Sequence, residues 1–171
     1  MIKFLFTSYA CDNMDENFMK CGFTSNSDDW ATPKNLFNYL NDKFHFTLDP
    51  CADKYNHKCE KYYSEMDSGL SHSWKDETVF MNPPYGKNIK YWVAKAYNES
   101  KNNGITVIGL LPARTDTKWF HDYCIKSDEI IFIKGRLKFG DGSNSAPFPS
   151  IIIIWNGKNF NPKMSFMDAI N

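Results

Sequence analysis

A five-residue turn, Asn82-Pro83-Pro84-Tyr85-Gly86, directly follows an apolar run at residues 78–81 and precedes a helical pattern at residues 89–101. The apolar run is typical of a strand. The two prolines fix φ and remove two backbone donors, so the turn is rigid and offers mainly hydrogen-bond acceptors. A strand, a turn and a helix in this order place the turn at the carboxyl end of a strand, where open α/β sheets bind ligands. The sequence therefore predicts an α/β fold with a binding site at this turn.

The residue types in the turn suit an amino group carried by a planar molecule. An amino nitrogen conjugated to a ring is a poor nucleophile, and acceptors that hold its N–H groups favour the pyramidal form that takes up a methyl group. Asn82 can supply one acceptor and the Pro83 carbonyl another, while Tyr85 offers a face for stacking. Asn82, Pro83 and Tyr85 are therefore candidate catalytic residues, and Pro84 and Tyr85 candidate substrate contacts. The alternative is an ordinary proline-rich turn or a polyproline recognition segment.

Strand and helix patterns alternate along the rest of the chain. Thr32 is a candidate N-cap and Pro33 a candidate first residue of a helix that runs to about Lys43. Further helices are predicted at residues 89–101 and 117–125, and strands at residues 44–48, 61–63, 78–81, 105–111, 129–133, 136–139 and 150–155. The alternation predicts a Rossmann-like three-layer α/β/α sheet, mostly parallel, in which residues 136–139 and 150–155 form an antiparallel edge hairpin.

Length and composition fit one compact domain. A chain of 171 residues with 42% hydrophobic residues can bury a core but has little room for a second domain. We expect a single domain at residues 24–171 and a poorly ordered extension at residues 1–23, with Met19 as an alternative start to Met1.

Charge and cysteine content bear on partners. The net charge is zero, so no global basic surface indicates nucleic acid, although basic residues gather after the turn and acidic ones near the start. Five cysteines, with no signal peptide and no long apolar run, predict reduced thiols and a cytoplasmic protein. Cys51, His57 and Cys59 could be zinc ligands, but their spacing lacks a Cys-x-x-Cys pair, so no metal is predicted.

Several separate blocks carry a family resemblance. They are Asp29-Trp30-Ala31-Thr32-Pro33, residues 46–52, Asp67-Ser68-Gly69-Leu70, the turn at Asn82, Pro112-Ala113-Arg114-Thr115-Asp116-Thr117, Gly135-Arg136-Leu137 and Ala146-Pro147-Phe148-Pro149-Ser150. In these blocks and their order, residues 24–156 resemble the phage-type DNA N-6-adenine methyltransferases, which use S-adenosylmethionine. The Asn-Pro-Pro-Tyr turn alone is shared with methyltransferases of DNA, RNA and protein glutamine, so residues 112–117 and 146–150 are the narrower signals.

The resemblance implies a binding site for S-adenosylmethionine. It assigns Asp49, Cys51 and Ala52 to the end of the first strand, although the usual glycine-rich loop is missing there. The remaining cofactor contacts that it implies are Trp30, Thr32, Pro33, Asp67, Leu70 and Asn82. Three of these assignments have a structural alternative: an Asp-Pro turn without ligand at Asp49-Pro50, an ordinary helix start at Thr32-Pro33, and an exposed turn aspartate at Asp67.

The resemblance also implies duplex DNA as the substrate. Arg114 and Arg136 would contact phosphates and Phe148 would act as an aromatic wedge beside a flipped adenine, with Arg114–Asp116 pairing and a core position for Phe148 as alternatives. The implied activity is site-specific methyl transfer to N6 of adenine, which would protect phage DNA from restriction in the host cytoplasm. The other possibilities are an RNA or protein amine methyltransferase and an inactive DNA-binding or anti-restriction module.

Overall fold

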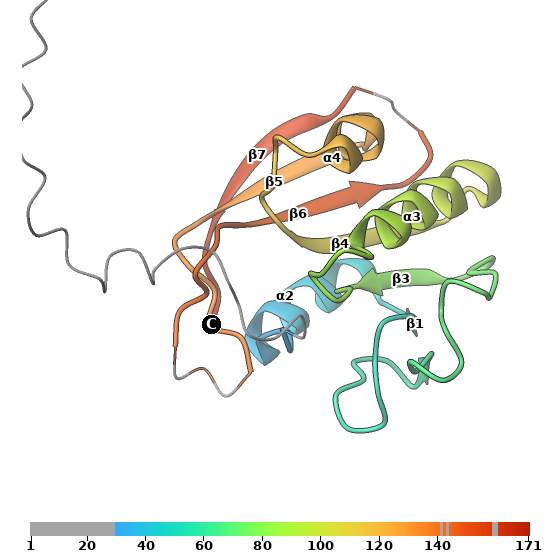
Figure 1. Ribbon diagram of the computed structural model, residues 1–171, viewed down its shortest axis with the longest axis horizontal. Coiled ribbons are helices and arrows are strands. Elements are labelled where there is room, and N and C mark those ends of the chain that lie inside the picture. The colour runs from blue at the N-terminus through green and yellow to red at the C-terminus, as the bar shows by residue number, and fades with distance from the viewer. Residues whose placement is uncertain (1–29, 141, 143, 159–160) are drawn as a thin grey trace, which may run out of the picture.

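The computed structural model describes residues 30–140, 142, 144–158 and 161–171. The predicted extension at residues 1–23 lies outside these ranges, as do Asp29, Asp141 and Ser143. The described part of the chain is built around a seven-stranded mixed sheet (Figure 1).

Strands follow one another across the sheet in the order β2-β1-β3-β4-β6-β5-β7. They are β1 (Leu48–Asp49), β2 (Lys61–Tyr62), β3 (Thr78–Met81), β4 (Thr106–Pro112), β5 (Glu129–Lys134), β6 (Ser150–Trp155) and β7 (Lys163–Asp168). Strand β6 runs antiparallel to both of its neighbours, β4 and β5, and the other described pairs are parallel. The predicted fold class, a mostly parallel α/β sheet with an antiparallel pair, is confirmed.

The position of the antiparallel strand differs from the prediction. Residues 136–139 form no strand, and β6 lies inside the sheet between β4 and β5, whereas β7, which the sequence analysis did not predict, forms the edge. Every residue of β6 is buried, as expected of a central strand with both faces covered. Leu137 instead closes a loop, since its carbonyl accepts the amide N–H of Ala146 at 2.8 Å.

Helices cover both faces of the sheet. Helix α2 (Lys34–Phe44) packs on one face, where Phe37 meets Phe80 edge to face at 5.2 Å. Helices α3 (Ile89–Asn103) and α4 (Lys118–Tyr123) lie on the other face, and a 3-10 turn (Cys124–Lys126) follows α4 (Figure 1). The indole N–H of Trp155 donates to the Tyr123 carbonyl at 3.1 Å, which ties the end of α4 to β6. The sheet, with α2 on one face and α3 and α4 on the other, therefore forms a three-layer α/β/α arrangement (Figure 1).

Two boundaries near the start of the domain differ from the predicted ones. Helix α2 begins after Pro33, which is the N-cap residue, and no side chain caps it. It continues to Phe44, so the predicted strand at residues 44–48 is reduced to β1. His45 ends the helix with φ 53°, in the left-handed region. The side chain of Thr32 is therefore free to serve a different partner.

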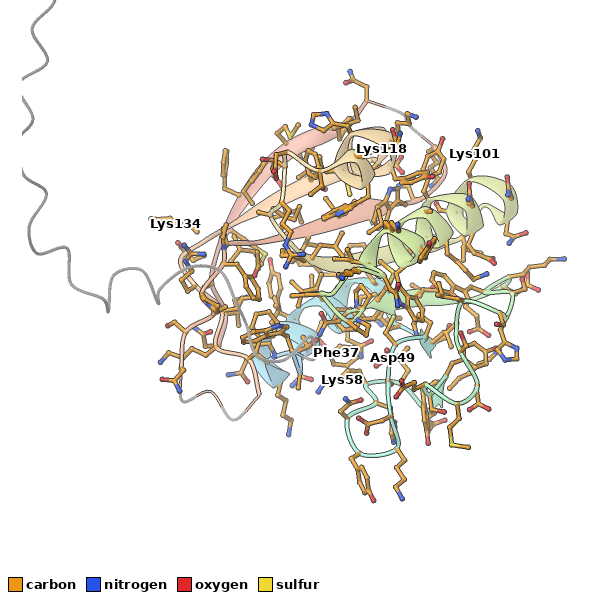
Figure 2. All side chains as sticks on the ribbon, viewed as in Figure 1. Phe37, Asp49, Lys58, Lys101, Lys118 and Lys134 are labelled. Atoms are coloured by element: carbon orange, nitrogen blue, oxygen red, sulfur yellow. The ribbon has the colours of Figure 1, made fainter. Side chains whose placement is uncertain are left out.

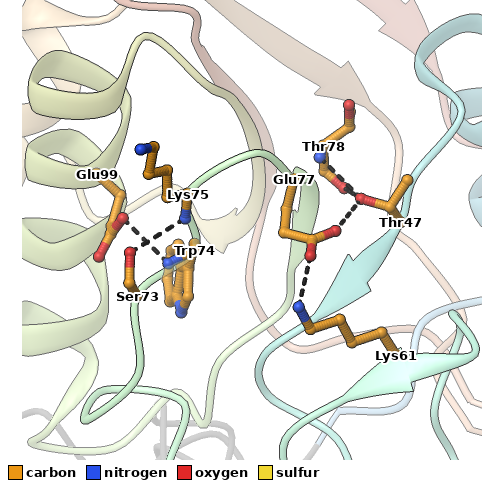
Figure 3. Close-up of polar contacts among 8 residues, drawn as sticks. All are labelled: Thr47, Lys61, Ser73, Trp74, Lys75, Glu77, Thr78 and Glu99. Carbon is orange, nitrogen blue, oxygen red and sulfur yellow. Dashed lines mark hydrogen bonds and ion pairs between the residues drawn. The ribbon is translucent and has the colours of Figure 1, made fainter.

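A buried glutamate fixes the connection between β2 and β3. Glu99 of α3 accepts the Trp74 amide N–H at 3.1 Å (Figure 3). Glu99 also pairs with Lys95 at 2.7 Å. The Trp74 indole N–H in turn donates to the Gly69 carbonyl at 2.9 Å. A Cβ on Gly69 would lie 2.2 Å from the Pro50 carbonyl oxygen, so only glycine lets this connection pack directly on the end of β1.

Candidate active site

The turn after β3 lies beside the end of β1, and a cavity of about 120 Å³ opens between them. We call it the Asn82 cavity. Its walls include seven of the residues that the sequence analysis had proposed: Trp30, Thr32, Asp49, Cys51, Asn82, Pro83 and Pro84. Four further wall residues had not been proposed: Ala31, Asn56, Lys58 and Phe80. The structure thus brings the segment before α2, the end of β1 and the rigid turn to one place.

The Asn82 side chain is held in one orientation. Its Nδ2 donates to the Trp30 carbonyl at 2.5 Å and to Oγ1 of Thr32 at 2.9 Å. Because a carbonyl oxygen can only accept, the amide nitrogen must face Trp30, and the amide oxygen must face the other way. Oδ1 of Asn82 is buried and has no hydrogen-bond partner among the described residues. A fixed acceptor is therefore available at the site predicted to hold an amine.

Asp49 supplies a buried carboxylate at the same cavity. The side chain is 4% exposed, and its two oxygens accept the backbone N–H groups of Cys51 at 3.2 Å and Lys58 at 3.1 Å. Both Asp49 and Lys58 are labelled in Figure 2. Burial raises the pKa of Asp49 to about 6, although the two backbone hydrogen bonds act in the opposite direction. Asp49 therefore shapes the loop at residues 51–58 and carries negative charge at neutral pH.

Four proposed cofactor contacts lie outside the Asn82 cavity. Pro33 is buried at the start of α2, and the amide of Ala52 is used in a hydrogen bond to the Tyr63 carbonyl at 3.1 Å. Asp67 is exposed and accepts from Oγ of Ser64 at 2.9 Å. Leu70 lines a separate groove along α3. None of these four residues lines the Asn82 cavity.

Tyr85 is buried and presents no open face in this structure. It is 2% exposed, its hydroxyl donates to the Leu110 carbonyl at 3.2 Å, and burial raises the pKa of the phenol. The rings of Phe148 and Phe139 meet it edge to face, with centroids at 5.5 Å and 6.3 Å. Trp30 packs on the same two phenylalanines, at 5.0 Å and 5.5 Å. Trp30, Tyr85, Phe139 and Phe148 together form an aromatic cluster.

A second, larger cavity of about 660 Å³ brings the three other predicted DNA contacts together. Arg114, Arg136 and Phe148 all line it, so we call it the Arg114 cavity. Both arginines are exposed, whereas Phe148 is 8% exposed. Arg114 donates from a terminal guanidinium nitrogen to the Tyr85 carbonyl at 3.0 Å, which connects this cavity to the turn. The ion pairs between described residues do not include Arg114 with Asp116.

The described residues contain no cluster of three or more histidine, cysteine or acidic side chains that could hold a metal ion. His57 instead stacks on Tyr62 with ring centroids 4.3 Å apart, and its Nδ1 lies 2.9 Å from the Cys59 carbonyl. No helix in the described ranges has the length and apolar character to cross a membrane.

Comparison with known proteins identifies the family. The family model for the DNA N-6-adenine-methyltransferases (Dam) matches residues 22–170. The chain belongs to this family. It is 31% identical over 143 residues to a DNA N-6-adenine-methyltransferase of Haemophilus phage HP1, covering 78% of this chain and 82% of that one. The predicted class, a DNA adenine-N6 methyltransferase, is confirmed.

Two further matches cover less of the other protein. A DNA N-6-adenine-methyltransferase of Escherichia phage T1 is 35% identical over 110 residues, which is 63% of this chain and 45% of that one. Among solved structures, a modification subunit of a putative type I restriction enzyme from Vibrio vulnificus YJ016 aligns with a TM-score of 0.48 and 9% identity. That alignment covers 82% of this chain and 47% of the other.

The four wall residues that the sequence did not indicate have no local sequence pattern that marks them as part of a site. Lys58 and Asn56 lie in an irregular loop, and the hydrogen bond from the Lys58 amide to Asp49 helps to hold that loop over the end of β1. Phe80 was assigned to a strand interior, which gave no indication that it also borders a cavity. Ala31 lies between two residues that had been proposed, so its neighbours were the available signal.

Proposed function

We propose that this methyltransferase uses S-adenosylmethionine as the methyl donor and modifies N6 of adenine in DNA at the Asn82 turn. The observation that carries the proposal is the buried Oδ1 of Asn82, which has no partner among the described residues while its amide nitrogen is fixed. A buried acceptor without a partner is costly, by about 1–3 kcal/mol, so a donor is expected in the functional complex. The adenine amino group is such a donor.

The residues of the Asn82 cavity fit one end of the donor. When bound, S-adenosylmethionine supplies an electrophilic methyl group on a sulfonium, next to an ammonium and a carboxylate. Asp49 offers a buried negative charge toward a cationic group, and Thr32, Trp30 and Cys51 line the same space. A volume of about 120 Å³ is small beside the ~300 Å³ at the lower end of common ligand pockets, so the cavity would hold only part of the molecule.

The chain contributes to the reaction through acceptor placement and alignment. Oδ1 of Asn82 and the Pro83 carbonyl accept the two amino hydrogens, which reduces conjugation of the nitrogen with the ring and directs its lone pair at the methyl group. Holding the nitrogen in line supplies much of the rate advantage. After transfer, the nitrogen loses its surplus proton to water, since neither an amide nor a carbonyl oxygen is basic enough to keep it.

DNA is proposed to bind over the Arg114 cavity, with the target adenine turned out of the helix. Arg114 and Arg136 match phosphate oxygens with their planar guanidinium groups. Phe148 lies between this cavity and the turn and would contact the extruded base. Tyr85 would stack on the base only after Phe148 or Phe139 has moved, because both rings now pack against it.

The proposal is tested by transfer of a labelled methyl group from S-adenosylmethionine to unmethylated duplex DNA. The DNA is then digested to nucleosides and the labelled nucleoside identified by chromatography. N6-methyladenine with the wild-type protein, and its absence with Asn82→Ala, is the expected result. Label on RNA or protein but not on DNA would overturn the proposal.

We further propose that methylation is sequence-specific and protects phage DNA from restriction in the host cytoplasm. The Gly142 and Asn144 region follows Arg136 along the chain, and polar residues of this loop would read bases near the target. Mapping the methylated adenines in a random-sequence library, followed by digestion with a nuclease blocked at the mapped site, checks this. Methylation at all adenines alike would contradict it.

A further inference from the structure

Trp30, a wall residue of the Asn82 cavity, carries a second buried polar group without a partner, its indole N–H. Nε1 of Trp30 has less than 1 Å² of exposed surface and no hydrogen-bond partner among the residues that the structure describes. It is a donor only. Trp30 and Asn82 both line this cavity and are joined by a hydrogen bond, so two neighbouring residues carry an unused donor and an unused acceptor.

A backbone contact fixes the position of Trp30 relative to Asn82. The Trp30 carbonyl accepts from Nδ2 of Asn82 at 2.5 Å, which holds the main chain at Trp30 against the Asn82 side chain. The indole ring belongs to the aromatic cluster, in which it meets Phe148 edge to face at 5.0 Å with an interplanar angle of 89°. Phe148 lines the Arg114 cavity. The Trp30 ring thus lies at the junction between the Asn82 cavity and the proposed DNA side.

We propose that Trp30 determines base specificity by donating its indole N–H to the unprotonated ring nitrogen N1 of the target adenine, while Oδ1 of Asn82 accepts from the adjacent amino group. This inference rests on the proposed function and deepens it. Adenine carries an amino donor beside a ring acceptor, which complements the acceptor of Asn82 and the donor of Trp30. Guanine and thymine carry an oxygen acceptor beside a ring N–H. Their oxygen would therefore face the acceptor Oδ1 of Asn82, and their ring N–H would face the donor N–H of Trp30. Cytosine has the same pair as adenine, and ring size must separate those two bases.

The hydrogen bond is isolated by combining Trp30→Phe with a substrate analogue. The substrate is a duplex oligonucleotide with one mapped target adenine, prepared also with 1-deazaadenine at that position, which replaces N1 by C–H. For adenine, Trp30→Phe is expected to lower kcat/KM by roughly fivefold to tenfold, the range of one hydrogen bond. For 1-deazaadenine, the wild type and Trp30→Phe are expected to agree within about twofold, because the acceptor is already absent.

Two outcomes would overturn the proposal. If Trp30→Phe lowers kcat/KM by the same factor on both duplexes, or on neither, the indole N–H does not contact N1. If affinity for S-adenosylmethionine, measured by calorimetry, falls by the same factor as kcat/KM, the indole N–H serves the donor. Trp119→Phe, which truncates a buried tryptophan that lines neither cavity, is the control.

A measurement on the wild-type protein does not depend on the folding of the variant. The Trp30 indole resonance in ¹⁵N-labelled protein should shift downfield with the adenine duplex and not with the 1-deazaadenine duplex. Identical shifts with the two duplexes would refute the contact. Failure of the proposed function would look different, because the wild type would then methylate no adenine in either duplex.

Discussion

The Asn82 cavity and the Arg114 cavity are built in opposite ways, although both are connected to the turn that follows β3. The Asn82 cavity is small, about 120 Å³, and its key polar atoms are buried and fixed by hydrogen bonds. The Arg114 cavity is about 660 Å³, and its two arginines are exposed. Chemistry on one nitrogen atom needs an acceptor that does not move, whereas a long anionic polymer can be held by exposed charges that adapt to it. The Arg114 contact to the Tyr85 carbonyl joins the two regions.

The largest effect that separates the two cavities is expected from Asn82→Ala. Loss of the fixed acceptor should lower the methyl-transfer rate by roughly 10²- to 10³-fold or more, comparable to removal of a hydrogen-bonding group that stabilises developing charge. Affinity for S-adenosylmethionine should change little, because Oδ1 faces the amine. Single-turnover kinetics and calorimetry measure the two quantities, and Asn98→Ala on the exposed face of α3 is the control. A parallel collapse of donor affinity would contradict the assignment of Asn82 to the amine.

Gly69→Ala tests whether a change in the packing at the end of β1 affects binding at the Asn82 cavity without affecting binding at the Arg114 cavity. The new Cβ would lie 2.2 Å from the Pro50 carbonyl oxygen, so the backbone must shift, at a cost of about 1–3 kcal/mol in stability. We expect weaker donor affinity with unchanged DNA affinity, by calorimetry and fluorescence anisotropy. Gly104→Ala is the control, since a Cβ there meets no atom within 4 Å and only its φ of 67° opposes the change. Equal losses of donor and DNA affinity would show that the cavities are not independent.

Arg136→Ala probes the Arg114 cavity without touching the turn. One lost phosphate contact should weaken DNA binding by about tenfold at low salt and reduce the slope of log K against log salt by roughly 0.9. Arg114→Ala should do the same and also slow transfer, because it releases the Tyr85 carbonyl. Anisotropy titrations at several salt concentrations measure the slope, with Lys118→Ala on α4 as the charge-matched control. A salt slope unaffected by either arginine would return both residues to a structural role.

The smallest expected effect is a pH dependence of donor affinity. Burial raises the pKa of Asp49 in the free protein to about 6, so the carboxylate is protonated increasingly as the pH falls below that value. A cationic ligand prefers the ionised form, and affinity should therefore be lost on acidification. At pH 5.5 about a quarter of Asp49 is ionised, which predicts about fourfold weaker binding than at pH 7.5. Calorimetry in buffers of different ionisation enthalpy would also detect proton release near pH 6. An Asp49→Asn variant should lose this pH dependence, and its persistence would exclude Asp49 as the titrating group.

The predictions from the sequence were most accurate where a local pattern is sufficient. Strands β3 and β6 have the predicted bounds, and α3 begins at the predicted residue, because apolar runs and helical spacing are properties of neighbouring residues. The place of β6 in the sheet was wrong, and β7 was missed. Strand order depends on pairing between distant segments, such as Ile151 of β6 with Leu111 of β4, which no local pattern reports.

At the candidate active site, too, local sequence patterns predicted some features and contacts between distant residues decided the others. The sequence by itself determined the rigid acceptor turn, since two adjacent prolines restrict the backbone in any context. The family resemblance placed Asp49 at the end of the first strand by its position, and the structure shows that it is buried. Only the tertiary structure decided that Asn82 turns its oxygen away from Trp30, that Tyr85 is covered by Phe148, and that Lys58 reaches the cavity. Each of these depends on a contact between residues far apart in the chain, where packing of the whole core selects one orientation from several that the local sequence allows.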